Sequence, residues 1–425
     1  MIPDDGPLGL SHAAARPYAV ALFCVCAVLA GVVAFRPPRG ERSRRLPVWV
    51  PILALALAVR ALASLAVDGQ LYDVLFAYRR IGGNLFNGSE IWSGDTAGMA
   101  NYPPTLYVWW AVAGLVPANH PHVFAALVRA PFWIADAAIA LVLLRGVGGE
   151  RGRRAAWLYA LCPVAIAVPT LHGQADPVVD LLLVVSVIMA TRGRSVACGL
   201  FGGIAVAIKQ WPLFFLPALL AATPRRRAVT LLLLFAVPVL LVYAAYAVVH
   251  PADALRGMFD VATYRPHRAG LGTALLFPLP AGPIIAINLA VLATATLCGV
   301  LAVRAGCTLA EAIALDMLLI VGLSPTAYDQ YLMWAFPMLL LAGRLRTAAL
   351  LGVGLLPAVL SLDLWTAQGD GDTPDVLLIL STVSLLAAAV SLLPLSWRRR
   401  WRHGRPRDDV ARRSVHRYAG SVELS

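Results

Sequence analysis

The chain has almost no lysine: of 35 Lys and Arg residues in 425 positions, Lys209 is the single lysine. Charged residues of both signs make up 14%, against 60% hydrophobic residues, and the mean hydropathy is +0.74. A soluble globular chain of this length needs a larger polar surface to cover so much apolar side chain. The composition therefore excludes a soluble domain and indicates an all-α protein that crosses a membrane several times.

Cysteine is scarce, and the familiar nucleotide and metal motifs are absent. The six cysteines show no zinc spacing and no disulfide framework. No Walker loop, Rossmann glycine pattern, zincin motif or nucleophile elbow stands in a credible context. The net charge of +12 collects in arginine-rich pieces such as 36–45 and 398–407. These fit the inner side of a membrane better than a nucleic-acid surface, so we expect membrane lipids and no nucleic acid as partners.

Apolar runs predict most of the helices, because a bilayer core needs about 20 apolar residues per helix. The simple candidates are 17–35, 47–67, 123–144, 155–171, 176–191, 228–248, 283–303, 308–323, 330–343, 347–364 and 375–396.

Two further apolar segments, 101–122 and 196–222, do not fit a single span. If 101–122 crossed the membrane, the arginine-rich loop 145–154 would lie outside, against the positive-inside rule. We therefore expect a re-entrant or surface-lying helix there. The segment 196–222 has arginines at both ends, so the chain must go out and return. Pro212 lacks an N–H and disfavours helix before it, which predicts two short helices broken near Gln210.

These choices give about thirteen transmembrane helices, with the C-terminus inside and arginine clusters on one side. The organisation we predict is an extra helix and basic inner loop over 1–46, a catalytic membrane core over 47–345, C-terminal transmembrane helices over 346–397 and a basic cytoplasmic tail over 398–425.

The outer loops hold the polar residues that could carry chemistry. Around Asp73 and Tyr78, the spacing of residues is that of an amphipathic helix on the outer surface, although a solvated loop carboxylate is an alternative for Asp73. His172, Gln174 and Asp176 gather at a break between two helices. Asp176 before a proline is also typical of a helix N-cap, which would explain it without a substrate.

Lys209 is the strongest single signal. A lysine near mid-bilayer costs about 2.5–3.5 kcal/mol on insertion scales unless it pairs, snorkels or loses its proton. Its compact ammonium suits a contact to a phosphate, with snorkelling to the outer surface as the alternative. Arg265 and Arg268 stand in a predicted outer loop, contrary to the arginine bias, which indicates an anionic ligand. A second outer loop carries Tyr328, Asp329 and Gln330, for which a capping turn is the plain alternative.

Five motifs in this order resemble the integral-membrane GT-C glycosyltransferases, specifically the polyprenol-phosphate-mannose-dependent members of glycosyltransferase family 87. They are "DVLFAYRRIGGNLF" from Asp73, "NYPPTLYVWW" with Tyr102, "HGQADPVVDLLL" from His172, "GLFGGIAVAIKQWPLFFLPALL" around Lys209 and "SPTAYDQYLMWAFP" with Tyr328. The resemblance covers about 60–345. It implies a GT-C fold, a catalytic carboxylate in the first outer loop, which Asp73 matches, and a lipid-phosphate sugar donor bound at the outer leaflet.

The chemistry of such a transfer agrees with these residues. One aspartate, Asp73, can take the proton of an acceptor hydroxyl, and single displacement predicts inversion at the sugar. Cations must stabilise the lipid phosphate that leaves, and Lys209, Arg265, Arg268 and His172 are the candidates. The remaining candidates, for contacts to substrate, are Tyr78, Tyr102, Gln174, Asp176, Tyr328, Asp329 and Gln330. We expect no cofactor and no obligatory metal.

The reaction we predict transfers a hexose, with mannose favoured, from a polyprenyl-phosphate donor to a glycolipid or polysaccharide acceptor at the outer face of the plasma membrane. A transporter or flippase of a lipid-linked anion is the alternative, since embedded charge and broken helices also mark transport sites. A membrane scaffold without enzymatic activity is a third reading.

Overall fold

A computed structural model describes residues 12–35, 47–66, 72–89, 91, 102–251, 281–325, 329–364 and 375–393, and this part of the chain is helical, without a strand. Its elements are α1 (His12–Phe35), α2 (Trp49–Ala66), the π-helical η1 (Tyr72–Tyr78), α3 (Arg79–Phe86), α4 (Thr105–Ala113), α5 (Pro121–Val147), α6 (Gly149–Ala160), α7 (Pro163–Ala167), the π-helical η3 (Val168–His172), α8 (Asp176–Thr191), α9 (Ser195–Ile208), the 3-10 helix η4 (Trp211–Phe215), α10 (Leu216–Ala222), α11 (Arg225–Val249), α14 (Ala281–Arg304), α15 (Leu309–Leu323), the 3-10 helix η5 (Asp329–Met333), α16 (Ala335–Leu341), α17 (Leu345–Leu364) and α18 (Asp375–Leu392).

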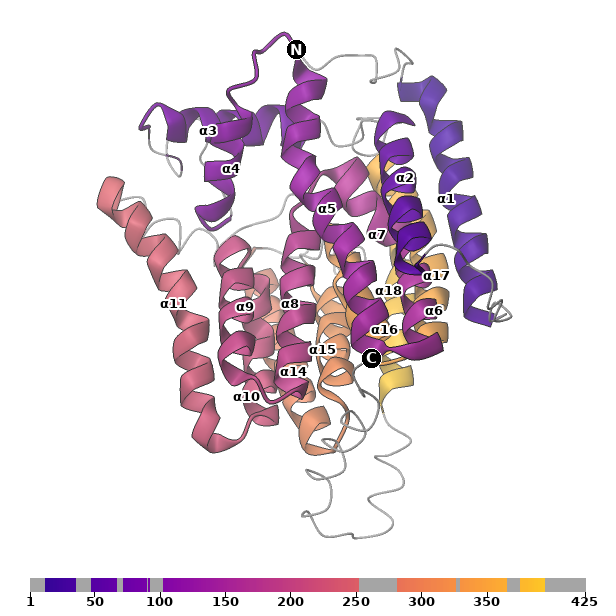
Figure 1. Cartoon of the computed structure of the whole chain (residues 1–425), viewed down its shortest axis with the longest axis vertical. Helices are drawn as coiled ribbons and strands as arrows, with labels where there is room; N and C mark the ends of the chain where they lie inside the picture. Colours follow the sequence, from indigo (N-terminus) through magenta and orange to yellow (C-terminus); the bar gives the residue numbers. More distant parts are fainter. Residues whose placement is uncertain are drawn as a thin grey trace.

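The helices form a bundle of roughly aligned elements (Figure 1). Several of them are apolar enough for a membrane, which makes this a membrane protein. Among the described residues, four helices are long and apolar enough to cross a bilayer: most of α1, α5, α11 and most of α14. The count becomes five if α6 and the segment 163–172, which meet at a bend of 54°, form one span. The predicted count of about thirteen is not confirmed, because helices such as α8 and α9 have 16 and 14 residues and fall short of a bilayer by length.

The two unusual segments have the local structure that the sequence predicts. Within 101–122 the helix α4 has nine residues, about 14 Å at 1.5 Å per residue, which is too short to cross a membrane. The segment 196–222 is a helical hairpin: α9 ends at Ile208, Lys209 is extended, and η4 and α10 return. Pro212 falls in the first turn of η4, at the break.

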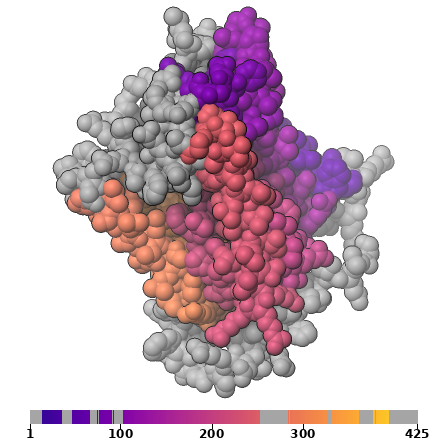
Figure 2. Space-filling model, turned by 90° about the vertical axis from the view of Figure 1, so that its left-hand side faces the viewer, coloured from indigo at the N-terminus to yellow at the C-terminus, as the bar shows by residue number. Residues whose placement is uncertain are grey.

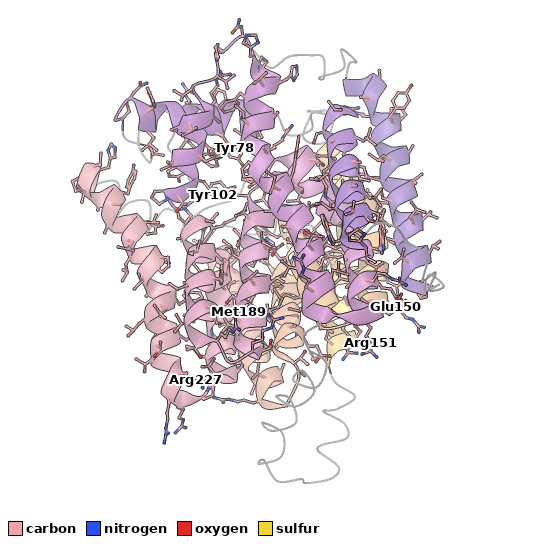
Figure 3. All side chains as sticks on the ribbon, in the orientation of Figure 1. Tyr78, Tyr102, Glu150, Arg151, Met189 and Arg227 are labelled. Carbon is pink, nitrogen blue, oxygen red and sulfur yellow. The ribbon has the colours of Figure 1, made fainter. Side chains whose placement is uncertain are left out.

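The predicted outer residues and the arginine-rich turns lie at opposite ends of the bundle. Tyr78 and Tyr102 are at the upper end, whereas Arg151 and Arg227 are at the lower end (Figure 3). At that lower end Arg227 Nη1 donates to the Gly193 carbonyl at 2.9 Å, which joins two of the arginine-bearing turns. The elements η1, α3 and α4 therefore cap the end of the bundle that carries the polar loops (Figure 1).

The helices α9 and α11 pack with their backbones in contact. A Cβ added at Gly203 would lie 2.3 Å from the Phe235 carbonyl oxygen, and one at Gly199 would lie 2.7 Å from the Leu231 carbonyl oxygen. The opposite side of α11 is apolar and exposed, and it forms a long face of the molecule together with α14 (Figure 2). This distribution is that of a helix with one side against protein and the other against lipid.

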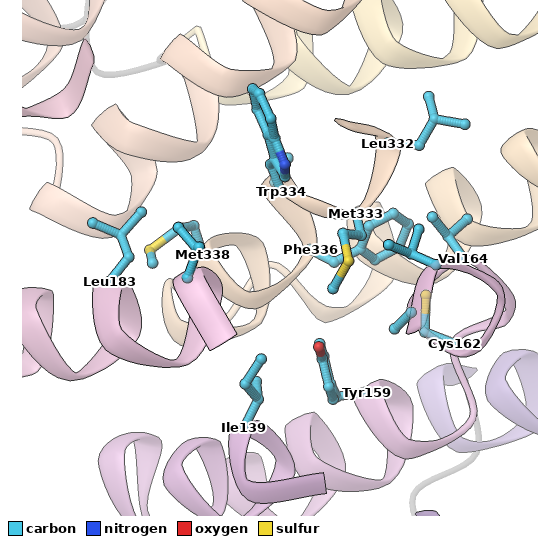
Figure 4. Close-up of a cluster of buried hydrophobic side chains, with 14 of the residues drawn as sticks. Ile139, Tyr159, Cys162, Val164, Leu183, Leu332, Met333, Trp334, Phe336 and Met338 are labelled. Atoms are coloured by element: carbon cyan, nitrogen blue, oxygen red, sulfur yellow. The ribbon is translucent and has the colours of Figure 1, made fainter. Parts of the chain in front are cut away.

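The short helix α16 fills the centre of the bundle. All seven of its residues are buried. Phe336 and Met338 of α16, and Met333 before it, enter a cluster of buried side chains with Leu183 of α8 and Tyr159 of α6 (Figure 4). Trp334 stands at the edge of this cluster, where the apolar core gives way to the polar site described next (Figure 4).

Candidate active site

Two interruptions of helical structure lie side by side at the upper end of the bundle. The first is the turn between η3 and α8, where Gly173 has a φ of +73° that side chains with a Cβ rarely adopt. The second is the extended residue Lys209 after α9, with φ −151° and ψ 133°. The side chains at the two breaks meet inside the protein, through a contact between Lys209 and Asp176.

The two breaks are joined by a buried ion pair. Lys209 Nζ donates to Asp176 Oδ2 at 2.7 Å, and Trp334 Nε1 donates to the other carboxylate oxygen at 2.6 Å. Asp176 is fully buried, and Lys209 is 3% exposed. The carboxylate thus connects α8, the tip of the α9 hairpin and the segment between η5 and α16.

Aromatic rings enclose the Lys209 ammonium. It lies 5.1 Å from the centre of the Tyr102 ring and 5.6 Å from that of Tyr331, within the range of a cation–π contact. Trp211 of η4 stacks on Trp334 with centroids 4.1 Å apart. The cation is therefore stabilised by one carboxylate and two ring faces, without contact to water on most of its surface.

The loop that the sequence predicts to lie outside, with Tyr78 and Tyr102, reaches the same cluster through stacked rings. Tyr78, at the end of η1, stacks on Trp110 of α4 with centroids 4.0 Å apart, and Tyr102 meets the edge of that indole at 5.8 Å. The Tyr102 hydroxyl donates to Gln174 Oε1 at 2.8 Å. Segments far apart in the sequence thus converge on the two breaks.

Most of the site residues predicted from the sequence lie in the described part of the chain, and the structure brings most of these together. Tyr102, Gln174, Asp176 and Lys209 are in direct contact with one another or share a partner, and Tyr78 joins them through Trp110. His172 is buried at the first break, and Gln330 is buried in η5. Arg265, Arg268 and Tyr328 lie outside the described residues, as do the side chains of Asp73 and Asp329.

The structure corrects two alternatives that the sequence left open, the N-cap at Asp176 and snorkelling by Lys209. Asp176 is no N-cap: that position is Ala175, which has no side-chain cap, while the Asp176 carboxylate is taken by Lys209 and Trp334. Lys209 does not snorkel to the surface, because it is buried and ion-paired. Both corrections have one cause, since each break supplies the counter-charge that the other one lacks.

Charged groups also lie deeper in the bundle, so Lys209 is one of several embedded charges. Arg60 of α2 pairs with Asp136 of α5, which also accepts from the Tyr159 hydroxyl at 2.5 Å. Asp180, one turn below Asp176 on α8, is fully buried and interacts electrostatically with Asp176, Asp136 and Lys209. Neither Asp180 nor Asp316 of α15 has a hydrogen-bond partner for its carboxylate among the described residues.

Sequence reasoning missed three residues at this site, Trp334, Tyr331 and Arg129. The tryptophan and tyrosine follow Gln330 in an apolar run, where they look like ordinary core residues. Arg129 lies inside the predicted span 123–144, and a charge within a span was the signal that could have identified it. No three His, Cys, Asp or Glu side chains of the described chain lie close enough together to hold a metal ion.

The arrangement is that of a membrane protein with a polar, aromatic-lined site at one end of its bundle. Residues 101–262 match the model of glycosyltransferase family 87. This segment runs from the residue before Tyr102 through both helix breaks and beyond α11, so it contains most of the described site. Over this segment the chain is similar to that family, and the match indicates an enzyme, a glycosyltransferase. A comparison with curated proteins found no match.

Proposed function

We propose that the protein transfers a hexose, with mannose favoured, from a polyprenyl-phosphate donor to a glycolipid or polysaccharide acceptor at the outer face of the plasma membrane. The observation that supports this most directly is the convergence of the first outer loop, both helix breaks and η5 on the Lys209–Asp176 pair, within the segment that matches the glycosyltransferase family. The aromatic rings around it suit a sugar, whose C–H faces pack against aromatic faces, and the apolar exterior suits a lipid-linked donor.

The reaction follows as a single displacement. The acceptor hydroxyl oxygen forms a bond to the anomeric carbon, and the bond from that carbon to the phosphate oxygen breaks, with its electron pair leaving on the lipid phosphate. Asp73 takes the hydroxyl proton as general base, and the sugar inverts because a single displacement occurs at its anomeric carbon. Lys209, Arg265, Arg268 and His172 stabilise the phosphate charge, and the leaving group needs no proton because it is already a stable anion.

The test is transfer in reconstituted vesicles that contain a radiolabelled polyprenyl-phosphate mannose and extracted envelope glycolipids. Asp73→Asn should abolish transfer while thermal unfolding in detergent stays close to that of the wild type. Asp316→Asn is the matched control, because it makes the same chemical change in an aspartate that has no proposed role in the reaction. Asp316 packs against Gly299 of α14, and the variant should retain activity. Transfer by Asp73→Asn at the wild-type rate would exclude this base. Mass spectrometry of glycolipids from cells with and without the protein identifies the product.

A flippase for the lipid-linked sugar is the second candidate, and the buried charges below the site favour it. Arg60, Asp136 and Asp180 continue the polar groups toward the middle of the bundle, as a transport path requires. Vesicles that move a fluorescent polyprenyl-phosphate sugar between leaflets, without forming a glycosidic bond, would support this candidate against the transferase.

A further inference from the structure

Arg129 is a buried arginine on the face of α5 that meets the first helix break. It is 2% exposed and stands about 12 Å along the helix from Pro121, at the end of the bundle that carries the polar site. One turn further on, Trp133 Nε1 donates to the Pro169 carbonyl of η3 at 3.1 Å. The same face of α5 thus supports the break at two successive turns.

The Arg129 side chain packs directly against the turn. A Cβ added at Gly173 would lie 3.1 Å from Arg129 Nε and 3.7 Å from its Cγ. Gly173 stands between His172 and Gln174, and Gln174 accepts the hydrogen bond from Tyr102. The glycine therefore lets the arginine approach the backbone of the break, and it places a guanidinium beside the residues named for phosphate and sugar.

The first outer loop meets Arg129 at the same point. The added Cβ at Gly173 would lie 2.6 Å from Val74 Cγ2, and Val74 follows Asp73 directly in η1. Because Val74 and the Arg129 Nε both approach this one point, the arginine stands at the junction of the break and the loop that carries the proposed base. Lys209 is linked to the same turn through Tyr102, whose ring it faces and whose hydroxyl donates to Gln174.

The ion pair of Lys209 leaves room for a further cation in the binding of an anionic ligand. The Lys209 ammonium is already balanced by Asp176 at 2.7 Å, so the pair as a unit is neutral toward an incoming phosphate. A lipid phosphate monoester carries between one and two negative charges near neutral pH. A guanidinium suits it well, because its parallel N–H groups can donate to two phosphate oxygens at once.

We propose that Arg129 binds the phosphate of the polyprenyl donor and holds it after the sugar has left. This inference rests on the proposed function, since it names the group that receives the negative charge of the leaving lipid phosphate. It adds a residue of α5 to a site whose other proposed members belong to the outer loops and the two breaks.

Equilibrium binding to the protein in nanodiscs tests this without a sugar, an acceptor or turnover. The probes are a polyprenyl monophosphate and the uncharged polyprenol of the same chain length. The wild type should bind the phosphate tighter than the alcohol. Arg129→Met should weaken binding of the phosphate about tenfold or more and leave binding of the alcohol unchanged, as expected for the loss of a charge-assisted contact.

Two further variants complete the test. Arg80→Met is the matched control, because Arg80 is an exposed arginine of α3 whose guanidinium lies over the Phe76 ring, and it should bind both probes like the wild type. Arg129→Lys keeps the charge, so it serves as the test if Arg129→Met does not fold. It should retain part of the preference, because a lysine donates from a single point.

The outcomes separate the two proposals. If the wild type prefers the phosphate and Arg129→Met keeps that preference in full, the role of Arg129 is wrong while the proposed donor class stands. If the wild type binds phosphate and alcohol equally, the proposed function itself fails. Loss of the preference in folded Arg129→Met, with Arg80→Met unchanged, supports the inference.

Discussion

Replacing Lys209 with methionine should destabilise the protein by about 3–5 kcal/mol, the usual effect of removing one partner from a buried ion pair. The reason is the environment of Asp176, which is fully buried and would keep only the hydrogen bond from Trp334. A carboxylate left in this position loses its counter-charge without gaining water. The effect is larger than the loss of lysine packing alone would give, because methionine fills much of the same space.

The double variant Lys209→Met with Asp176→Leu removes both charges and should lie within about 1–2 kcal/mol of the wild type, since replacing a whole buried pair by apolar residues is often close to neutral. The difference between the double variant and the sum of the single ones measures the coupling of the pair. Unfolding of each variant in mixed micelles, followed by tryptophan fluorescence, gives these values.

The pair Arg344 and Glu311 serves as a control, because the arginine is 44% exposed and its side chain lies 2.5 Å from the carboxylate. Arg344→Met should change stability by at most about 1 kcal/mol. Additive effects of Lys209→Met and Asp176→Leu would refute the reasoning, because they would mean that neither residue needs the other.

Three further predictions concern the packing of the helices and of the site. Gly203→Ala should destabilise the protein strongly, because the methyl group would lie 2.3 Å from the carbonyl oxygen of Phe235. Gly31→Ala is the control and should be neutral, since nothing lies within 4 Å of the new Cβ. Thermal unfolding compares the two variants. Trp334→Phe should lower stability by about 1.5–3 kcal/mol through the lost hydrogen bond to Asp176, measured in the same micelles, and an unchanged midpoint would contradict that bond. Gly173→Ala should reduce transfer and raise the donor KM, since the turn needs φ +73° and the methyl group would displace the side chains beside it; unaltered kinetics would show that the turn tolerates a Cβ.

Sequence alone predicted the local structure of the chain well where one rule dominated. The run 176–191 is bounded as predicted, because its hydropathy, the preceding Gly173 and the proline in its first turn all indicate the same start. The hairpin over 196–222 followed from arginines at both ends and from Pro212, before any contact was known. The number of spans did not follow, because hydropathy does not show where an apolar run bends or shortens.

The contacts inside the site could not be predicted in the same way. Lys209 and Asp176 are 33 residues apart and on different helices, so their pairing depends on which faces of α8 and α9 meet. Periodicity in these helices is weak, since nearly all their residues are apolar. The charge of Arg129 within a predicted span was visible, but its neighbours at Gly173 and Val74 come from the fold.

The close contact of α9 with α11 has a mechanical consequence for the part of the chain that follows. Because glycines replace a layer of side chains between them, the two helices have little freedom to slide and behave as one rigid pair. In this pair, α9 ends at Lys209 and α11 ends at His250. The segment that carries Arg265 and Arg268 follows His250 in the sequence. The anchoring point of that arginine segment is therefore fixed relative to the lysine, and neither can shift along the membrane normal without carrying the other with it.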